Sequence, residues 1–196
     1  MHAGHTRHPP IVKHCGIRNA SRACPDRSLP IAMHHDAFLS YLDRVHERTR
    51  RIVVLIPPAD LDWTPASGRF TFGDVVRHLA GIERYMYAET VHGRPSRYPG
   101  HDRSLADGAA SVLSYYDRLH SESRALFASL QESRFTESCQ TPAGTPITVW
   151  KWLRALIEHE AHHRGQLYLM LGLRGVTTPH LYGLSAEEVL ARSLPQ

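Results

Sequence analysis

Apolar side chains recur at helical spacing through most of the chain after residue 33. Such a stripe is typical of a helix that buries one face against other helices. It predicts a first helix over residues 36–56 and a second helix over residues 72–91. Thr71 and Asp74 have the spacing of a capping box, which supports the start of the second helix.

The second half of the chain continues this pattern. It predicts helices over residues 104–130 and 146–173, and a short final helix over residues 185–193. Thr145 would cap the helix that starts at 146, where a proline suits the first turn. No segment shows the alternation of a β-strand, and the long connections fit a bundle with at least one crossover. The predicted fold is therefore all-α.

Residues 1–33 differ in character from the rest of the chain. They hold four prolines and four histidines without apolar periodicity, so we expect a disordered N-terminal extension before a single folded domain over residues 34–196. The net charge of +4 also lies there, in five basic residues against one acidic residue. The remainder is neutral overall, which argues against a nucleic-acid partner.

The sequence lacks the patterns of a membrane-spanning segment, a disulfide framework and a secretory signal. No apolar run approaches the roughly 20 residues that a membrane-spanning helix needs, so we expect no membrane segment. The three cysteines are scattered and form no disulfide framework or CxxC metal site. With no secretory signal pattern at the N-terminus, we expect a cytoplasmic protein.

The chain has 15 histidines, and their positions on the predicted helices separate them. At about 100° per residue, His159 and His163 fall within roughly 60° of Leu156, which lies on the buried stripe of its helix. His162 falls roughly 120° from Leu156, towards the flank. His159 and His163 are one turn apart and point inward, so both imidazoles can reach one ion.

His78 lies on the apolar face of the second predicted helix. A lone inward histidine is more often a hydrogen-bonded core residue than a ligand. Together with His159 and His163 it favours a shared divalent metal ion, because three unpaired buried imidazoles would be costly. Three neutral histidines leave coordination positions open, as in a catalytic site. The set fits zinc, nickel or iron(II), and imidazole alone does not choose among them.

Several segments resemble the DinB-like family, which also includes YfiT-type metal-dependent hydrolases and bacterial low-molecular-weight thiol transferases. The most specific is the HxxxHRGQ run in the predicted fourth helix. The resembling segments are Leu61-Asp62-Trp63, FGDVVRHLAGIE over 72–83, HEAHHRGQL over 159–167 and PHLYG over 179–183. The resemblance covers most of the predicted folded domain and leaves out residues 1–33.

The resemblance implies an up-up-down-down four-helix bundle and often a homodimer. It also implies metal ligation by His78, His159 and His163. Many family members have a metal site without an established substrate, so the family alone does not define the reaction. It does not imply translesion DNA polymerase activity.

We therefore predict a metal-dependent enzyme that acts on a small molecule, such as a low-molecular-weight thiol, by hydrolysis or thiol transfer. Glu160 and Arg164 are the candidate catalytic residues, with Glu83 as a further neighbour. Each of the three is explained equally well as a helix-surface charge or a salt bridge within the bundle. Gly165 could admit a neighbouring helix or a substrate, and a packing role is favoured.

Two other functions compete with this prediction. In the first, the ion only braces a non-catalytic metal-binding or stress-response bundle. In the second, His159 to His163 is an HExxH zinc protease motif with Glu160 as general base, and Glu187 or Glu188 supplies a distal ligand. No GxSxG, Walker A or GxGxxG motif is present, so serine-hydrolase and nucleotide-binding functions have no support.

Overall fold

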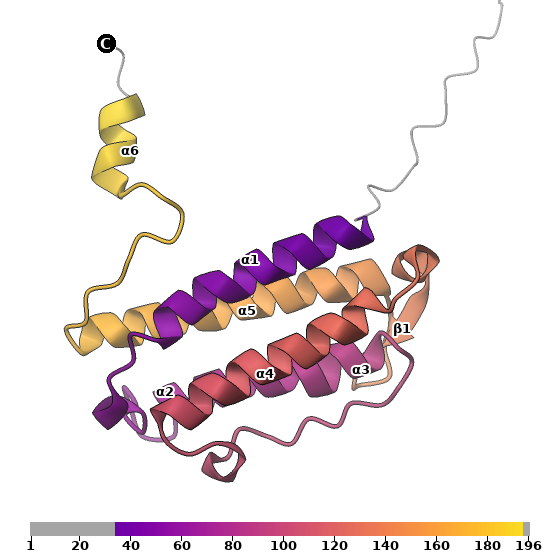
Figure 1. Ribbon diagram of the computed structural model, residues 1–196, viewed down its shortest axis with the longest axis horizontal. Helices are drawn as coiled ribbons and strands as arrows, with labels where there is room; N and C mark the ends of the chain where they lie inside the picture. Colours follow the sequence, from indigo (N-terminus) through magenta and orange to yellow (C-terminus); the bar gives the residue numbers. More distant parts are fainter. Residues whose placement is uncertain (1–33, 194–196) are drawn as a thin grey trace, which may run out of the picture. The chain divides into compact units, whose positions relative to one another are not determined.

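The computed structural model describes residues 34–193, so the expected disorder of residues 1–33 concerns residues outside this range. Four helical segments run the length of the folded part (Figure 1). They are α1 (His35–Val53), α2 (Phe72–Ile82) continued by η2 (Glu83–Tyr87) and α3 (Ala88–Thr90), α4 (Ala109–Ala128) and α5 (Val149–Leu173). A short helix, α6 (Ala186–Ser193), follows. None of the described helices is long and apolar enough to cross a membrane.

Contacts between helices establish their directions. α1 and α5 run parallel, α2 and α4 run parallel to each other, and the two pairs point in opposite directions (Figure 1). The contacts that show this are Thr49–Arg164 and Asp60–Arg174 for the first pair, Glu83–His120 and His92–Leu126 for the second, and His78–His159 and Thr90–Trp152 between the pairs.

In chain order the helices therefore run up, down, down, up. The all-α four-helix bundle expected from the sequence is confirmed, while the helix order differs from the up-up-down-down arrangement. The reason is that only the connection over residues 91–108 returns along the length of the bundle. The α1–α2 and α4–α5 connections each turn at one end of the bundle.

A short hairpin interrupts the otherwise helical chain. Strand β1 (Ser138–Gln140) pairs antiparallel with β2 (Pro146–Thr148), and Gly144 in the turn has a φ of 77°. The prediction of no strand was wrong here, because three residues are too few for alternation to be visible. Pro146 lies in β2, so α5 begins at Val149 rather than at 146.

The helix starts and ends show where local signals were sufficient. The predicted capping box is present, since Thr71 Oγ1 accepts from the Asp74 amide and the Asp74 carboxylate accepts from the Thr71 amide. Gly175, with a φ of 73°, ends α5 in the left-handed conformation that glycine adopts without strain. By contrast, α4 begins at Ala109 rather than near 104, because a separate 3₁₀ turn covers 103–105.

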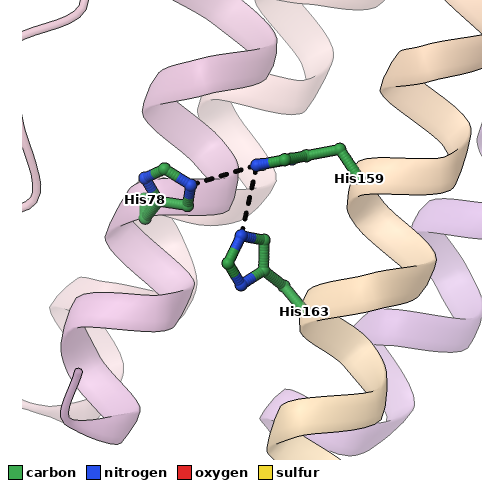
Figure 2. A group of neighbouring side chains, drawn as sticks. All are labelled: His78, His159 and His163. Atoms are coloured by element: carbon green, nitrogen blue, oxygen red, sulfur yellow. Dashed lines mark hydrogen bonds between the residues drawn. The ribbon is translucent and has the colours of Figure 1, made fainter. Parts of the chain in front are cut away.

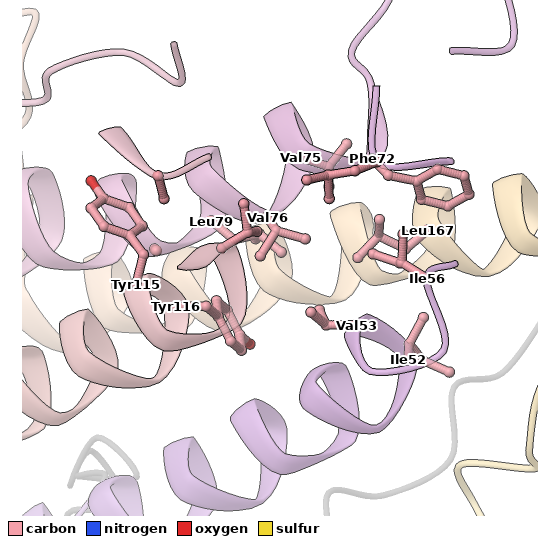
Figure 3. Packing of buried hydrophobic residues seen from close by; sticks show 14 of the residues in the cluster. Ile52, Val53, Ile56, Phe72, Val75, Val76, Leu79, Tyr115, Tyr116 and Leu167 are labelled. Atoms are coloured by element: carbon pink, nitrogen blue, oxygen red, sulfur yellow. The ribbon is translucent and has the colours of Figure 1, made fainter. Parts of the chain in front are cut away.

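Two apolar clusters fill the bundle. The cluster near the start of α2 includes Ile52, Phe72, Val75 and Leu167 (Figure 3). The other cluster, near the opposite end, contains Phe38, Phe127, Leu153 and Leu156 among its members. Fully burying a leucine or phenylalanine side chain contributes about 1.5–3 kcal/mol, so these clusters supply most of the driving force for folding.

A layer of polar side chains also lies in the bundle, and it is buried at His46, Thr49, His120 and Ser123 and partly exposed at its ion pairs. Two segments of eight residues contribute to it, DRVHERTR over 43–50 on α1 and DRLHSESR over 117–124 on α4. Both read aspartate, arginine, an apolar residue, histidine, two residues, a hydroxyl residue and arginine. The aspartate of each segment forms an ion pair with the last arginine of the other segment. The distances are 2.8 Å for Arg124 Nε–Asp43 Oδ1 and 3.0 Å for Arg50 Nε–Asp117 Oδ1.

The histidines of the two segments stack between these ion pairs. The rings of His46 and His120 lie 3.6 Å apart and within 7° of parallel, and Tyr116 stacks on the other face of His46. Burial, followed by the charge of His120, lowers the pKa of His46 to about 3. Burial also opposes the charge on His120, but its 3.0 Å contact with Glu83 outweighs this and raises the pKa of His120. His46 is therefore neutral, and the neighbouring His120 holds its proton more strongly than an ordinary imidazole.

Candidate metal centre

Three histidines from two helices meet between α2 and α5. The Nε2 atom of His159 lies 3.1 Å from Nε2 of His78 and 3.2 Å from Nε2 of His163 (Figure 2). One nitrogen from each ring lies within 4.8 Å of the other two. Among residues 34–193 this is the one group of histidine, cysteine and carboxylate side chains with donor atoms so close together.

The helical spacing that predicted these residues explains their positions. His159 and His163 are separated by one turn of α5 and project from the face that packs on α2, where His78 lies. The intervening His162 is exposed, and its one hydrogen bond among the described residues is with Gln166, at 3.1 Å. The structure thus brings the three predicted histidines together and leaves His162 outside the group.

The environment keeps these imidazoles neutral. Burial, followed by the charges of His163 and His159, lowers the pKa of His78 to about 3. Burial and the neighbouring His163 lower the pKa of His159 to about 4. The pKa of His163 is also lowered, mainly by burial. Neutral imidazoles offer a lone pair at one ring nitrogen, which is the form that binds a metal ion.

The outer ring nitrogens have hydrogen-bond partners that orient two of the rings. Nδ1 of His163 donates to Oε1 of Gln166 at 2.7 Å, because an amide oxygen can only accept. This bond leaves the lone pair of His163 on Nε2, which faces the other two histidines. Nδ1 of His78 lies 2.7 Å from the hydroxyl of Tyr98. Such partners of the outer nitrogen are typical of metal-bound histidine.

A cavity adjoins the histidines on the side of His163. Its volume is about 560 Å³, and His163 and Gln166 are its polar members next to the group. Phe70 lies over this side, with its ring 6.4 Å from that of His163 and nearly parallel to it. A small molecule in this cavity would contact His163, while its apolar part contacts Phe70 and Met170.

Glu160 and Arg164, the candidate catalytic residues, lie on other sides of α5. Glu160 accepts a 2.7 Å hydrogen bond from the Tyr116 hydroxyl on α4, and Arg164 donates to Thr49 on α1 at 3.2 Å. Only 4% of Glu160 and 5% of Arg164 is exposed, so neither is a helix-surface charge. Glu83 is buried as well. The structure does not bring these groups to the three histidines.

This placement bears on the HExxH interpretation. A protease base must reach a water at the metal, whereas the Glu160 carboxyl is bonded to α4. Burial, and then the charge of Glu83, raises the pKa of Glu160. Glu187 and Glu188 lie on α6 and do not belong to the group of close donor atoms. The third member of that group is His78.

The sequence alone did not identify Tyr98 or Phe70 as neighbours of the histidines. Tyr98 lies in the crossover connection and Phe70 in the loop before α2, and neither position has a periodicity that fixes its direction. Gln166 was visible as part of the HxxxHRGQ run, and its spacing of three residues from His163 is the signal that predicts their contact on one helix face.

Known proteins provide an independent comparison. A sequence profile of the DinB superfamily matches residues 41–167. The uncharacterized protein YrdA of Bacillus subtilis (strain 168) is 23% identical over 156 residues, which cover 78% of this chain and 90% of YrdA.

Solved structures resemble the same bundle. A DinB-like protein from Bacillus cereus ATCC 10987 has a TM-score of 0.66 and 20% identity, and the match covers 78% of this chain and all of the other. YfiT from Bacillus subtilis, described as a probable metal-dependent hydrolase with an unusual four-helix bundle topology, has a TM-score of 0.61 and 20% identity, with 79% of this chain and 94% of YfiT covered. At this identity the similarity concerns the fold.

Proposed function

We propose that this chain, which belongs to the DinB superfamily, binds one divalent metal ion through His78, His159 and His163 and uses it to act on a small molecule. The observation that carries the proposal is the convergence of three Nε2 atoms, two of the separations being 3.1 and 3.2 Å. The reaction class is hydrolysis or the transfer of a low-molecular-weight thiol, and the ion is zinc, nickel or iron(II).

The geometry fits an ion of this size. A tetrahedral ion about 2.0–2.1 Å from each imidazole nitrogen would hold the nitrogens roughly 3.4 Å apart, close to the separations here. Without a cation, His159 Nε2 carries either one proton or one lone pair, so only one of its two short contacts can be an N–H···N hydrogen bond. The hydrogen bonds to Tyr98 and Gln166 support the required ring orientations without using the inner nitrogens.

The chain's own side chains suggest how a substrate would be placed. A divalent ion with an open coordination position supplies an acidified water or a deprotonated thiol. Phe70 and Met170 give the adjoining cavity apolar walls, which favour a substrate with an apolar portion. Gln166 holds the orientation of His163 and also lines that cavity, so it is positioned to act on the ligand and the substrate at once.

Metal analysis of single variants tests the site. Protein purified without added metal should hold about one ion per chain, and His78→Ala, His159→Ala and His163→Ala should each lower the occupancy by at least about tenfold, the order seen even for loss of an outer partner. His162→Ala is the matched control and should keep the ion. Stoichiometric metal in His159→Ala, or its loss in His162→Ala, would refute the ligand assignment.

The reaction class needs a separate measurement. Metal-loaded and chelator-treated protein should be compared on ester and amide substrates and on pairs of a small thiol with an electrophile. Metal-dependent turnover that disappears in His78→Ala would support an enzyme. If loaded protein were inert while chelation lowered the melting temperature, the non-catalytic bracing role would replace catalysis without changing the site.

A further inference from the structure

Arg164 is a buried cation without a carboxylate partner. Its guanidinium donates to the Thr49 hydroxyl at 3.2 Å, to the Val45 carbonyl at 3.5 Å and to the Tyr182 hydroxyl at 2.9 Å. Among residues 34–193 no carboxylate oxygen lies within 4.0 Å of it. Glu160, one turn earlier on α5, is near enough for the charge of Arg164 to act against the effect of burial, which raises the pKa of Glu160, but its carboxyl is bonded to Tyr116 and makes no ion pair with Arg164.

The other buried arginine shows what a compensated site looks like here. Arg77, which is 1% exposed, pairs with Asp74 at 2.8 Å and donates to two backbone carbonyls. A buried charge without such a partner is strongly unfavourable. Of the five N–H groups of Arg164, the hydrogen bonds above use three, and Nε makes none with the described residues. Its site therefore has unused capacity for an anion.

A cavity opens beside this guanidinium on the face of α5 that looks towards residues 180–184. Its volume is about 380 Å³, and Arg164 is its one buried charged member. Apolar surface makes up most of the rest of the wall. Its lining includes Arg164, Gly165, Tyr168, Leu181, Tyr182 and Leu184.

Gly165 leaves the floor of this cavity open. No atom lies within 4 Å of the position that a Cβ would occupy, so helix packing does not require glycine there. Glycine within a helix costs about 1 kcal/mol relative to alanine. The packing role expected from the sequence is therefore not supported, and the missing side chain instead provides space next to Arg164.

Tyr182 closes the cavity, and a ligand could take the place of its hydroxyl on Arg164. It is 75% exposed, and its hydroxyl occupies one donor of Arg164. The guanidinium of Arg48 lies 5.3 Å from the Tyr182 ring centroid and has no ion pair among the described residues. His180 also lines the cavity. Arg48 therefore places a cation beside the entrance.

We propose that this cavity binds the carboxylate of a small organic acid with an apolar body, with Arg164 as the anion-binding residue and Gly165 as the floor. A planar carboxylate matches the planar guanidinium and can use Nε together with the Nη2 that Tyr182 now occupies. Tyr168, Leu181 and Leu184 would contact the apolar body. This site is separate from the three histidines, because Arg164 faces α1 and residues 180–184 rather than α2.

Calorimetric titration of the metal-loaded full-length chain with hexanoate tests the proposal. Hexanamide is the neutral control and inorganic phosphate the control for an anion without an apolar body. Hexanoate should bind with one site per chain, hexanamide should not bind measurably, and phosphate should bind at least about tenfold more weakly. Equal binding of hexanamide or of phosphate would overturn the assignment of the ligand class.

Variants locate the binding. Arg164→Met should weaken hexanoate binding by about 10- to 100-fold, as expected for lost hydrogen bonds to a charged group. Gly165→Leu should weaken hexanoate binding to a similar extent, because the new side chain fills the floor of the cavity. This variant keeps the charge of Arg164 and places a good helix former in α5, so it tests the site even if Arg164→Met fails to fold. His159→Ala should leave hexanoate binding unchanged. Loss of binding in His159→Ala, or unchanged binding in Gly165→Leu, would refute the site and leave the metal proposal intact.

Discussion

Two adjacent tyrosines on α4 offer a sharp test of how polar groups are stabilised inside the bundle. Tyr116 donates a 2.7 Å hydrogen bond to the buried carboxyl of Glu160. The hydroxyl of Tyr115 is also buried, but it has no hydrogen-bond partner among the described residues. Replacing either tyrosine with phenylalanine removes one hydroxyl and keeps the ring. The two changes should have different effects, because only one removes a hydrogen bond.

The magnitude follows from the environment of each hydroxyl. Tyr116→Phe leaves a carboxyl that is 4% exposed without its closest donor, and hydrogen bonds to a group of this kind are worth about 1.5–3 kcal/mol. We expect a loss of about 2 kcal/mol in the free energy of unfolding. Tyr115→Phe removes a buried hydroxyl that is already unpaired, so the change should be neutral or stabilising by up to about 1 kcal/mol.

Urea unfolding followed by circular dichroism gives both values under identical conditions. For a domain of this size, Tyr116→Phe should lower the melting temperature by roughly 4–8 °C. Both variants should keep their metal, because neither residue belongs to the group of three histidines. Equal destabilisation of the two variants, or a loss below about 0.5 kcal/mol in Tyr116→Phe, would show that the Glu160 hydrogen bond does not stabilise the fold as argued.

Three further changes test other parts of the structure. Gly73→Ala should destabilise the protein by about 1–3 kcal/mol in urea unfolding, since its Cβ would lie 2.9 Å from a nitrogen of the paired Arg77. The Cβ of Gly165→Ala meets no atom within 4 Å, so this variant should stabilise the protein by about 0.5–1 kcal/mol. The reverse order of the two stabilities would refute the packing argument. The pKa of His46 is lowered to about 3 in the folded chain, so His46 takes up a proton near pH 6.5 only when the chain unfolds. The free energy of unfolding should therefore fall as the pH drops from 6.5 towards 3, by up to about 1.4 kcal/mol per pH unit. Unfolding measured across this pH range should show a flatter slope for His46→Phe. Deleting residues 1–33 should leave the melting temperature and the metal content unchanged, because this segment has no apolar periodicity with which to join a core; a large drop in either would contradict that reasoning.

Periodicity was sufficient to predict the helices and the convergence of the three histidines. A residue's angle on a helix is a local property, so the facing of His159 and His163 towards a partner helix could be obtained without knowing that helix. The directions of the helices could not be obtained in this way. They depend on which connection crosses the bundle, and the hydrophobic pattern is the same for a helix that runs up or down.

The partners of Glu160 and Arg164 could not be predicted for a related reason. The single apolar stripe on α5 left each residue as either a helix-surface charge or a member of a salt bridge within the bundle. In the structure α5 contacts α1, α2 and α4, so more than one of its faces is covered. Polar residues at those positions are buried with partners from other helices, which the pattern along one segment does not reveal.

The paired segments over residues 43–50 and 117–124 have a consequence for how α1 and α4 align. The same surface occurs on both helices and faces itself, which is the arrangement of an isologous interface between two subunits, here formed within one chain. In a parallel alignment the aspartates would meet each other, and a slide by one turn, about 5.4 Å, would separate each aspartate from its arginine and unstack the histidines. This polar layer therefore selects a single axial register and a single direction for the helix pair.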